Sequence, residues 1–262
     1  NNNCYNKKTG KIIKAIIVVH VFGNAADLNS LINTCKKKNI KLVEDAAAAF
    51  GTKYKSGKLK NKFAGTIGDI GCISFNGNKV ITCGGGGMIL TNNKKYFNLS
   101  KYLSTQAYDS KFDYTHNDIG YNYRLANVNA AIGLAQIEKI NYYLKRKEKN
   151  FNFYKKNLNQ NKNFSICTKP SYAKNNNYIT SIFLKKKNIS KKTVINFLVR
   201  NNIEARSLWK PLHIQKSYKK YEKYKIIKAG QIFKNTINIP SSTNLTKTDL
   251  FKVVLKINQL LK

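Results

Sequence analysis

Three groups of side chains near the start of the chain have the types and spacing for chemistry at the edge of a sheet. Two adjacent carboxylates, Glu44 and Asp45, end a short apolar run and precede four alanines. A second apolar run, Cys72–Phe75, leads into the segment NGNK, which ends at Lys79. Four glycines, Gly84–Gly87, lack GxGxxG spacing and no helix follows directly, so we predict a tight turn between strands. A carboxylate at one strand end, a lysine beyond another and a glycine-rich turn together predict a bound cofactor.

The elements that would position these groups follow a strand–helix–strand order. Ala15–Val21 (AIIVVHV) is predicted to be a buried strand of a parallel sheet. Asp27 is expected to cap a helix, and Ile40–Val43 is the next strand. His20, inside the first strand, is interpreted as a structural residue. The result is a βαβ unit, so both carboxyl-terminal strand ends should lie at one sheet edge.

The later part of the chain predicts a second, smaller domain. One helix is expected over Asn93–Leu103, and a longer helix begins near Ala126. The apolar face of the longer helix, expected to bridge to the second domain, consists of Ala130, Ala131, Leu134, Ile137 and Ile140. Beyond about Asn150, short strands and helices alternate, and the cluster Asn175–Asn177 is interpreted as a turn. We predict an α/β architecture with domains at residues 1–140 and 141–262.

Composition limits the classes of function. The 262 residues are 42% hydrophobic, with no run long enough to span a membrane and no apolar core of a signal peptide, which predicts a soluble, cytoplasmic protein. The five cysteines form no CxxC pair, so neither a metal site nor a disulfide framework is expected. The net charge of +36 could indicate nucleic-acid binding, but the lysines are spread through every segment without a motif. Biased codon usage is therefore the favoured explanation, and we predict no nucleic-acid partner.

Three segments of the sequence resemble those of one enzyme family. SFNGNK (Ser74–Lys79), GYNYR (Gly120–Arg124) and WKPLH (Trp209–His213) are similar to segments of the DegT/DnrJ/EryC1/StrS sugar aminotransferases. The resemblance extends from about Ala15 to the C-terminus. It implies a fold-type I transferase dependent on pyridoxal 5'-phosphate, with a truncated large domain built on a mainly parallel sheet and a small C-terminal α/β domain.

The same resemblance implies a substrate and a reaction. An amino group would pass from glutamate to the keto group of a nucleotide-sugar, of the UDP-4-keto-6-deoxy-N-acetylhexosamine type. The product would serve the synthesis of surface-glycan precursors. A strongly basic protein would also attract such an anionic substrate.

The resemblance gives roles to residues at matching positions. Lys79 would form the Schiff base with the cofactor and then carry the proton during transfer. Asp45 would keep the pyridine nitrogen protonated, although the same carboxylate could instead cap the alanine-rich turn. Ser74 would bind the phosphate, although a serine at a strand end is common. Ala47 would lie beneath the ring, and Ala48 stands where the family usually has glutamine or another polar residue.

Further residues would act between subunits or from the small domain. Asn122 would reach the cofactor phosphate of a neighbouring subunit, which implies a homodimer with shared active sites. Arg124 in the same loop, and Lys210 and His213 in the WKPLH segment, would contact the substrate.

Relatives in this family carry an N-terminal portion before the strand that matches Ala15–Val21. That portion supplies a phosphate-binding loop and an aromatic residue that stacks on the cofactor. Two alternatives therefore accompany the prediction of an active aminotransferase. In the first alternative, the chain is a non-catalytic remnant or a subunit completed by another polypeptide. In the second, it is a basic nucleic-acid-binding protein.

Overall fold

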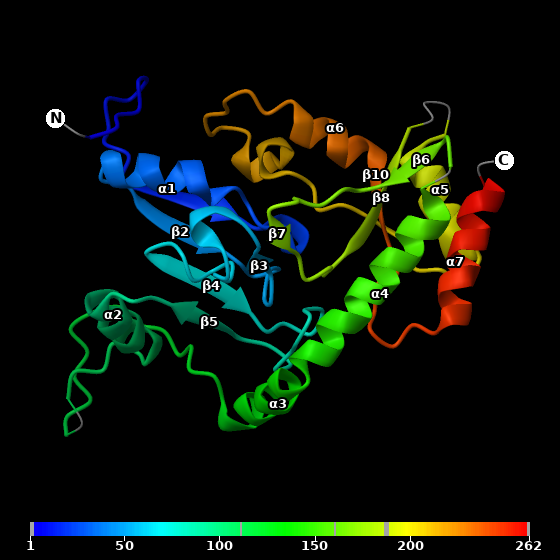
Figure 1. Ribbon diagram of the computed structural model, residues 1–262. Coiled ribbons are helices and arrows are strands. Elements are labelled where there is room, and N and C mark those ends of the chain that lie inside the picture. Colours follow the sequence, from blue (N-terminus) through cyan, green and yellow to red (C-terminus); the bar gives the residue numbers. More distant parts are fainter. Residues whose placement is uncertain (1–2, 111, 160, 186–188, 261–262) are drawn as a thin grey trace. The chain divides into compact units, whose positions relative to one another are not determined.

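The chain divides into two compact units in the computed structural model (Figure 1), which describes residues 3–110, 112–159, 161–185 and 189–260. The first unit comprises Asn1–Leu144 and Lys169–Tyr178, and the second comprises Lys145–Thr168 and Ile179–Lys262. The boundary predicted at residues 140 and 141 lies near the first crossing between units. The return of Lys169–Tyr178 to the first unit was not predicted from the sequence.

The first unit is built on a four-stranded sheet with the order β1-β2-β4-β5. β1 (Ala15–Val19) pairs in parallel with β2 (Lys41–Asp45), and β2 pairs in parallel with β4 (Ile70–Ser74). β5 (Gly87–Leu90) pairs antiparallel with β4. The connection from β1 to β2 is α1 (Leu28–Lys37), and the expected βαβ unit is therefore present.

Shorter elements complete the first unit. A 3-10 turn (Val21–Gly23) follows β1, and a second (Gly57–Leu59) follows β3 (Lys53–Tyr54), which pairs antiparallel with β7 (Ala173–Lys174). α2 (Lys94–Ser104) and α3 (Asn127–Glu138) come after β5. The β3–β7 pair is the point at which the returning segment Lys169–Tyr178 joins this unit.

α4 (Ile140–Leu158) begins in the first unit and ends in the second, whose sheet has the order β6-β8-β10-β9. These strands are β6 (Phe164–Ile166), β8 (Thr180–Leu184), β10 (Thr236–Ile239) and β9 (Arg206–Ser207), all antiparallel. The helices of this unit are α5 (Lys191–Arg200), α6 (Lys228–Asn235) and α7 (Lys247–Leu260), and two 3-10 turns span Leu212–Ile214 and Lys216–Tyr218. Its core is formed by Tyr154, Phe164, Ile182, Leu198, Ile237 and Ile257.

Two expectations about apolar segments were wrong. The strand predicted over Ala15–Val21 ends at Val19. Ile17 is 69% exposed because it lies on the face of β1 opposite Ile16 and Val18, which pack against the core of the first unit. The long helix predicted from Ala126 is divided at Lys139, and Leu134 on its predicted apolar face is 61% exposed. An apolar pattern therefore correctly indicated a strand and a helix, but not what covers them.

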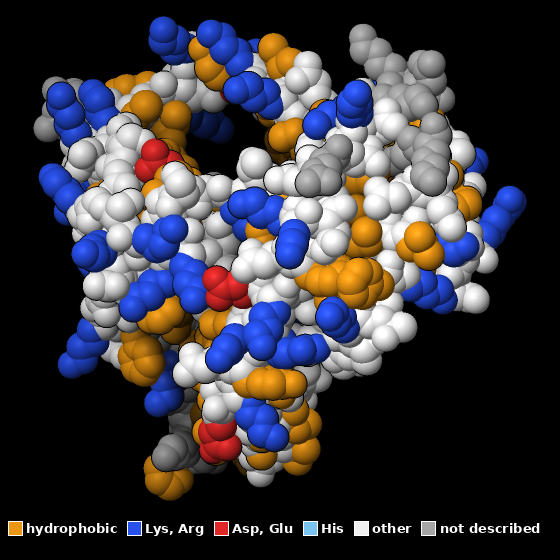
Figure 2. Space-filling view, turned by 45° about the vertical axis from the view of Figure 1, so that its right-hand side comes forward, with side chains coloured by type: hydrophobic (Ala, Val, Ile, Leu, Met, Phe, Trp, Pro, Cys, Tyr) orange, Lys and Arg blue, Asp and Glu red, His pale blue; other side chains and the backbone are white. Residues whose placement is uncertain are grey.

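The charge is distributed as the sequence suggested on the face that Figure 2 shows, where lysine and arginine side chains are scattered among other residues. Among the described residues, no helix is both long and apolar enough to cross a membrane.

Candidate active site

The carboxyl ends of β2 and β4 bring two predicted site residues to one edge of the sheet. β2 ends at Asp45 and β4 ends at Ser74, and Asp45 lies opposite Cys72 in the parallel ladder. Lys79 follows β4 after a short loop. Since ligands of α/β sheets bind beyond the carboxyl ends of the strands, this edge is the candidate site.

Glu44 and Asp45 are neighbours in sequence but have different surroundings, because successive side chains of a strand point to opposite faces. Asp45 is half-buried, and its Oδ1 accepts a hydrogen bond from the Ala47 N–H at 3.1 Å. This bond is consistent with the alternative in which Asp45 caps the alanine-rich turn. Glu44 is fully buried. Of the two carboxylates, only Asp45 is accessible to a ligand.

Glu44 is the centre of a buried hydrogen-bond network. Its Oε1 accepts from the backbone N–H groups of Ile67 and Gly68, each at 2.6 Å. Its Oε2 accepts from the N–H of Gly65 and from Nε2 of His20, each at 2.9 Å. The Nδ1 of His20 accepts from a backbone N–H at 3.0 Å, so the imidazole proton resides on Nε2. His20 is thus structural, as predicted, and it helps to fix the strand end that carries Asp45.

Lys79 is held by its loop and is half-buried. Its backbone N–H donates to the Asn76 carbonyl at 3.0 Å, and the Cys83 N–H closes the loop by donating to the Phe75 carbonyl at 3.0 Å. Burial lowers the pKa of the Lys79 amine, and the Asp45 carboxylate opposes this by favouring the charged form. The two predicted residues therefore interact electrostatically.

The remaining predicted cofactor contacts lie on the same two strand ends. Ser74 is half-buried, and its Oγ accepts from the Asn76 N–H at 3.3 Å, which leaves the hydroxyl hydrogen to donate elsewhere. Ala47 is partly accessible, whereas Ala48 is buried and its carbonyl accepts from Asn176 at 2.9 Å. The Ala48 methyl group therefore packs inside the unit.

Sequence reasoning missed the segment that packs against Lys79. The cluster Asn175–Asn177, interpreted as a turn, is buried, with Asn176 only 1% exposed. The following residue, Tyr178, is 4% exposed, and its ring centroid lies 5.2 Å from the Lys79 Nζ. Consecutive asparagines usually indicate exposed turns, but here their amides satisfy buried backbone groups. The apolar residues after Tyr178 were the only local indication of burial.

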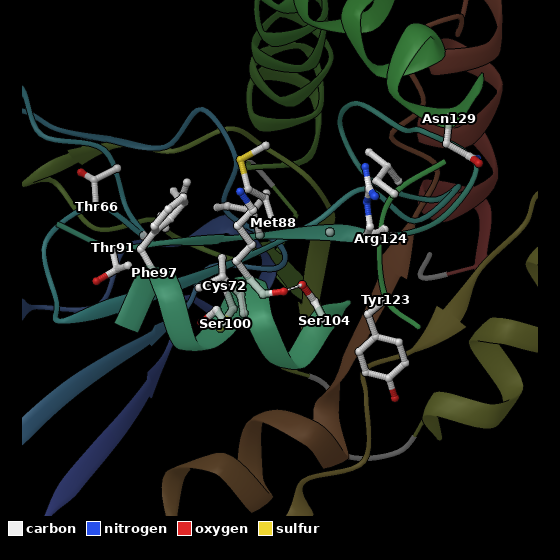
Figure 3. A pocket seen from close by; sticks show the side chains of 18 of the residues that line it. Thr66, Cys72, Met88, Thr91, Phe97, Ser100, Ser104, Tyr123, Arg124 and Asn129 are labelled. Atoms are coloured by element: carbon white, nitrogen blue, oxygen red, sulfur yellow. Dashed lines mark hydrogen bonds between the residues drawn. The ribbon is translucent and has the colours of Figure 1, made fainter. Parts of the chain in front are cut away.

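A separate pocket of about 1170 Å³ lies in the first unit beside β5 and α2 (Figure 3). Figure 3 shows Met88 and Phe97 on one side of it and Arg124 on the other. Among the described residues that line it, neither Asp45 nor Lys79 occurs. The predicted cofactor residues therefore lie outside this pocket.

Asn122 and Arg124 lie on the loop between α2 and α3, and both are exposed. Asn122 forms an isolated antiparallel bridge with Thr105 at the end of α2. The loop is also held against the end of α2 by the N–H groups of Tyr121 and Tyr123, which donate to the carbonyls of Leu103 at 2.7 Å and Ser104 at 3.0 Å. Their role in a neighbouring subunit's site stays a prediction.

Comparison with known proteins identifies the family. The profile of the DegT/DnrJ/EryC1/StrS aminotransferase family matches residues 3–258. The chain belongs to this family. The fold agrees, since a crystal structure of a DegT/DnrJ/EryC1/StrS aminotransferase from Brucella abortus superimposes with a TM-score of 0.86 at 22% identity, over 97% of this chain and 66% of that one. The predicted α/β class, with a mainly parallel sheet and a smaller α/β domain, is confirmed.

Named relatives in this family act on sugars. GDP-perosamine synthase of Escherichia coli O157:H7 is 35% identical over 94% of this chain and 65% of the relative. GDP-perosamine synthase of Caulobacter vibrioides is 32% identical over 95% of this chain and 66% of the relative. The UDP-4-amino-4,6-dideoxy-N-acetyl-beta-L-altrosamine transaminase of Campylobacter jejuni is 29% identical over 96% of this chain and 69% of the relative. The chain thus spans less than two thirds of the two synthases.

Two residues that the family resemblance placed near the substrate belong to the second unit. Lys210 is exposed, and its carbonyl accepts from the Gln215 side chain at 3.2 Å. His213 is half-buried in the 3-10 turn Leu212–Ile214. Because the structure describes each unit by itself, the approach of these residues to Lys79 stays a prediction.

Proposed function

We propose that this chain binds pyridoxal 5'-phosphate and transfers an amino group from glutamate to the keto group of a nucleotide-linked sugar. The observation that carries the proposal is the meeting of Asp45, Ser74 and Lys79 at one sheet edge in a member of an aminotransferase family.

The chemistry of these three side chains fits the three polar parts of the cofactor. A carboxylate suits a protonated ring nitrogen, a hydroxyl with its hydrogen available suits a phosphate, and an amine suits an aldehyde. The small Ala47 leaves room for a flat ring beside Asp45. Ala48 supplies no polar side chain toward the ring hydroxyl, where the family usually has glutamine or another polar residue.

Each residue has a distinct task in the proposed reaction. When bound, pyridoxal phosphate supplies an aldehyde carbon and a ring that withdraws electrons from the carbon being deprotonated. Asp45 holds a proton at the ring nitrogen, and Ser74 donates its hydroxyl hydrogen to a phosphate oxygen. Burial raises the neutral share of Lys79 by lowering its pKa, so its Nζ both attacks a carbonyl and accepts a proton more readily.

The substrate class follows from the relatives and the charge. Two of the relatives are named for GDP- and UDP-linked amino sugars, and the net charge of +36 favours a diphosphate-bearing substrate. Within this class we place Arg124, Lys210 and His213 near the sugar or its phosphates. Glutamate is the proposed amino donor.

We place the site in a homodimer. Asn122 and Arg124 are exposed on a loop that leads into α3, and α3 itself exposes Val128 (69%) and Leu134 (61%). An exposed apolar helix next to an exposed polar loop suits an interface whose rim reaches a neighbouring site. Asn122 would then contact the cofactor phosphate across the interface.

The test is an absorbance titration of the purified chain with pyridoxal phosphate. We expect a visible band in wild type and in Lys58→Ala, an exposed lysine of the same unit, but none in Lys79→Ala. Addition of glutamate should bleach the band if glutamate is the donor. An equal band in Lys79→Ala would contradict the role of Lys79. Sedimentation velocity of the same sample tests the dimer, which a monomer at every concentration would contradict.

A further inference from the structure

The ring of Tyr178 packs against the amine of Lys79. The Lys79 Nζ lies 5.2 Å from the ring centroid, within the range of about 6 Å over which an ammonium is attracted to an aromatic face. Tyr178 is buried, so the ring is a fixed surface. A lysine side chain has four rotatable bonds, and this contact restricts where its amine can lie.

Asn176 fixes the backbone that carries this ring. Its Nδ2 donates to the carbonyl oxygens of Ala48, at 2.9 Å, and Phe50, at 3.0 Å. Its Oδ1 accepts from the Tyr178 N–H at 2.9 Å. One buried amide thus joins the chain just past Asp45 to the backbone of Tyr178. A side chain with all of these bonds made is strongly held, because losing them would leave buried polar groups unsatisfied.

The loops after β1 and β2 both contribute to this anchor. Thr52 Oγ1 donates to the Gly23 carbonyl at 2.7 Å and accepts from the Asn176 N–H at 3.1 Å. The Asn175 Oδ1 accepts from the Ala25 N–H at 3.1 Å. Gly23 has a φ of +80°, and a Cβ at this position would overlap the Asn176 Oδ1. The close approach of Asn176 therefore requires glycine at position 23.

We propose that Tyr178 is a positioning residue for Lys79 and that Asn176 is the anchor that sets it. The ring face holds the lysine amine at the sheet edge, on the side from which it interacts with Asp45. The inference rests on the proposed function in that Lys79 matters as the cofactor lysine. The contact itself belongs to the protein alone, so it can be measured before any cofactor is added.

The experiment measures the titration of the Lys79 amine in the full chain freed of cofactor. Competitive acetylation at a series of pH values, read by mass spectrometry of the peptide that contains Lys79, gives its pKa. Because the ring face favours the charged amine, we expect Tyr178→Leu to lower this pKa by about 0.5 to 1 unit. Tyr178→Phe retains the ring and should leave the pKa unchanged. Tyr178→Met replaces Tyr178→Leu if the latter disturbs the fold.

Asn176→Ala tests the anchor separately, and it should lower the pKa of Lys79 in the same direction. An unchanged or raised pKa in Tyr178→Leu would overturn the inference, as would a fall of equal size in Tyr178→Phe. An unchanged pKa in Asn176→Ala would overturn the role of the anchor.

The visible band with pyridoxal phosphate distinguishes this inference from the proposed function. If wild type forms the Lys79-dependent band while Tyr178→Leu leaves the pKa unaltered, only the positioning role fails. If the pKa shifts as expected but wild type forms no band, the proposed function fails and the Tyr178 contact stands.

Discussion

Replacing Glu44 by glutamine tests the buried network that supports the strand end of Asp45. Glu44 accepts four hydrogen bonds, two on each carboxylate oxygen. Glutamine has one oxygen and one NH₂ group, so either its NH₂ faces the N–H groups of Ile67 and Gly68, or it faces Gly65 and His20. Two donors lose their acceptor in both orientations, either the buried pair Gly65 and His20 or the partly buried pair Ile67 and Gly68.

The magnitude follows from these two lost acceptors. An unsatisfied buried donor costs about 1–3 kcal/mol, so Glu44→Gln should destabilise the first unit by roughly 2–6 kcal/mol. The matched control is Glu204→Gln, which removes an exposed carboxylate paired with Arg206. An exposed ion pair contributes at most about 1 kcal/mol.

The assay must report on the first unit. The single tryptophan, Trp209, lies in the second unit, so its fluorescence during urea unfolding is an internal reference. Amide hydrogen exchange over residues 41–45 and 65–68 reports the first unit directly. Equal protection of these peptides in Glu44→Gln and Glu204→Gln would refute the reasoning.

The same carboxylate gives a pH dependence. Burial alone would raise the pKa of Glu44, but the hydrogen bonds from His20, Gly68, Gly65 and Ile67 together outweigh it, so the pKa is lowered. The stabilisation is therefore complete above the ordinary carboxyl pKa and is lost as the pH falls through the folded-state value. Glutamine does not titrate, so the difference in free energy of unfolding between wild type and Glu44→Gln should narrow in acid.

Two further predictions concern other parts of the chain. Gly23→Ala should destabilise the first unit by more than Gly10→Ala. Both glycines have positive φ, but only Gly23 lacks space for a methyl group, and hydrogen exchange measures both variants. In the second unit, burial lowers the pKa of Lys147 to about 8. The unfolded chain then binds more protons between about pH 8 and 10, so the free energy of unfolding should rise by about 2 kcal/mol over this range. Trp209 fluorescence should show this rise in Lys149→Met and not in Lys147→Met.

The candidate site residues were selected where a short motif carried the information, and their roles stay a prediction. Lys79 and Asp45 were selected through a family resemblance, and the structure places both at the expected sheet edge. Periodicity alone could not decide whether Glu44 or Asp45 is the carboxylate accessible to a cofactor, because alternation along a strand shows only that their side chains point to opposite faces. The deciding fact is the set of four donors around Glu44, three of them from residues 65–68, and no local pattern reveals it.

Two predictions of burial were wrong because the residue types of a segment do not show what packs against it. Asn175–Asn177 were interpreted as a turn because asparagine favours turns, yet each is buried, and Asn175 and Asn176 pair with backbone groups of other loops. The strand predicted over Ala15–Val21 was expected to be covered on both faces because it is apolar, yet Ile17 is exposed. The burial of the asparagines and the coverage of the strand both depend on segments far away in sequence.

The return of Lys169–Tyr178 to the first unit has a consequence for synthesis on the ribosome. Neither unit is one continuous stretch of chain, because the segment that bears Asn176 and Tyr178 is translated after α4 and β6. A nascent chain that already includes Lys79 and Asp45 therefore lacks the ring against which the lysine rests. The lysine site can mature only after Lys145–Thr168 of the second unit has been translated, whereas the second unit itself also needs Ile179–Lys262.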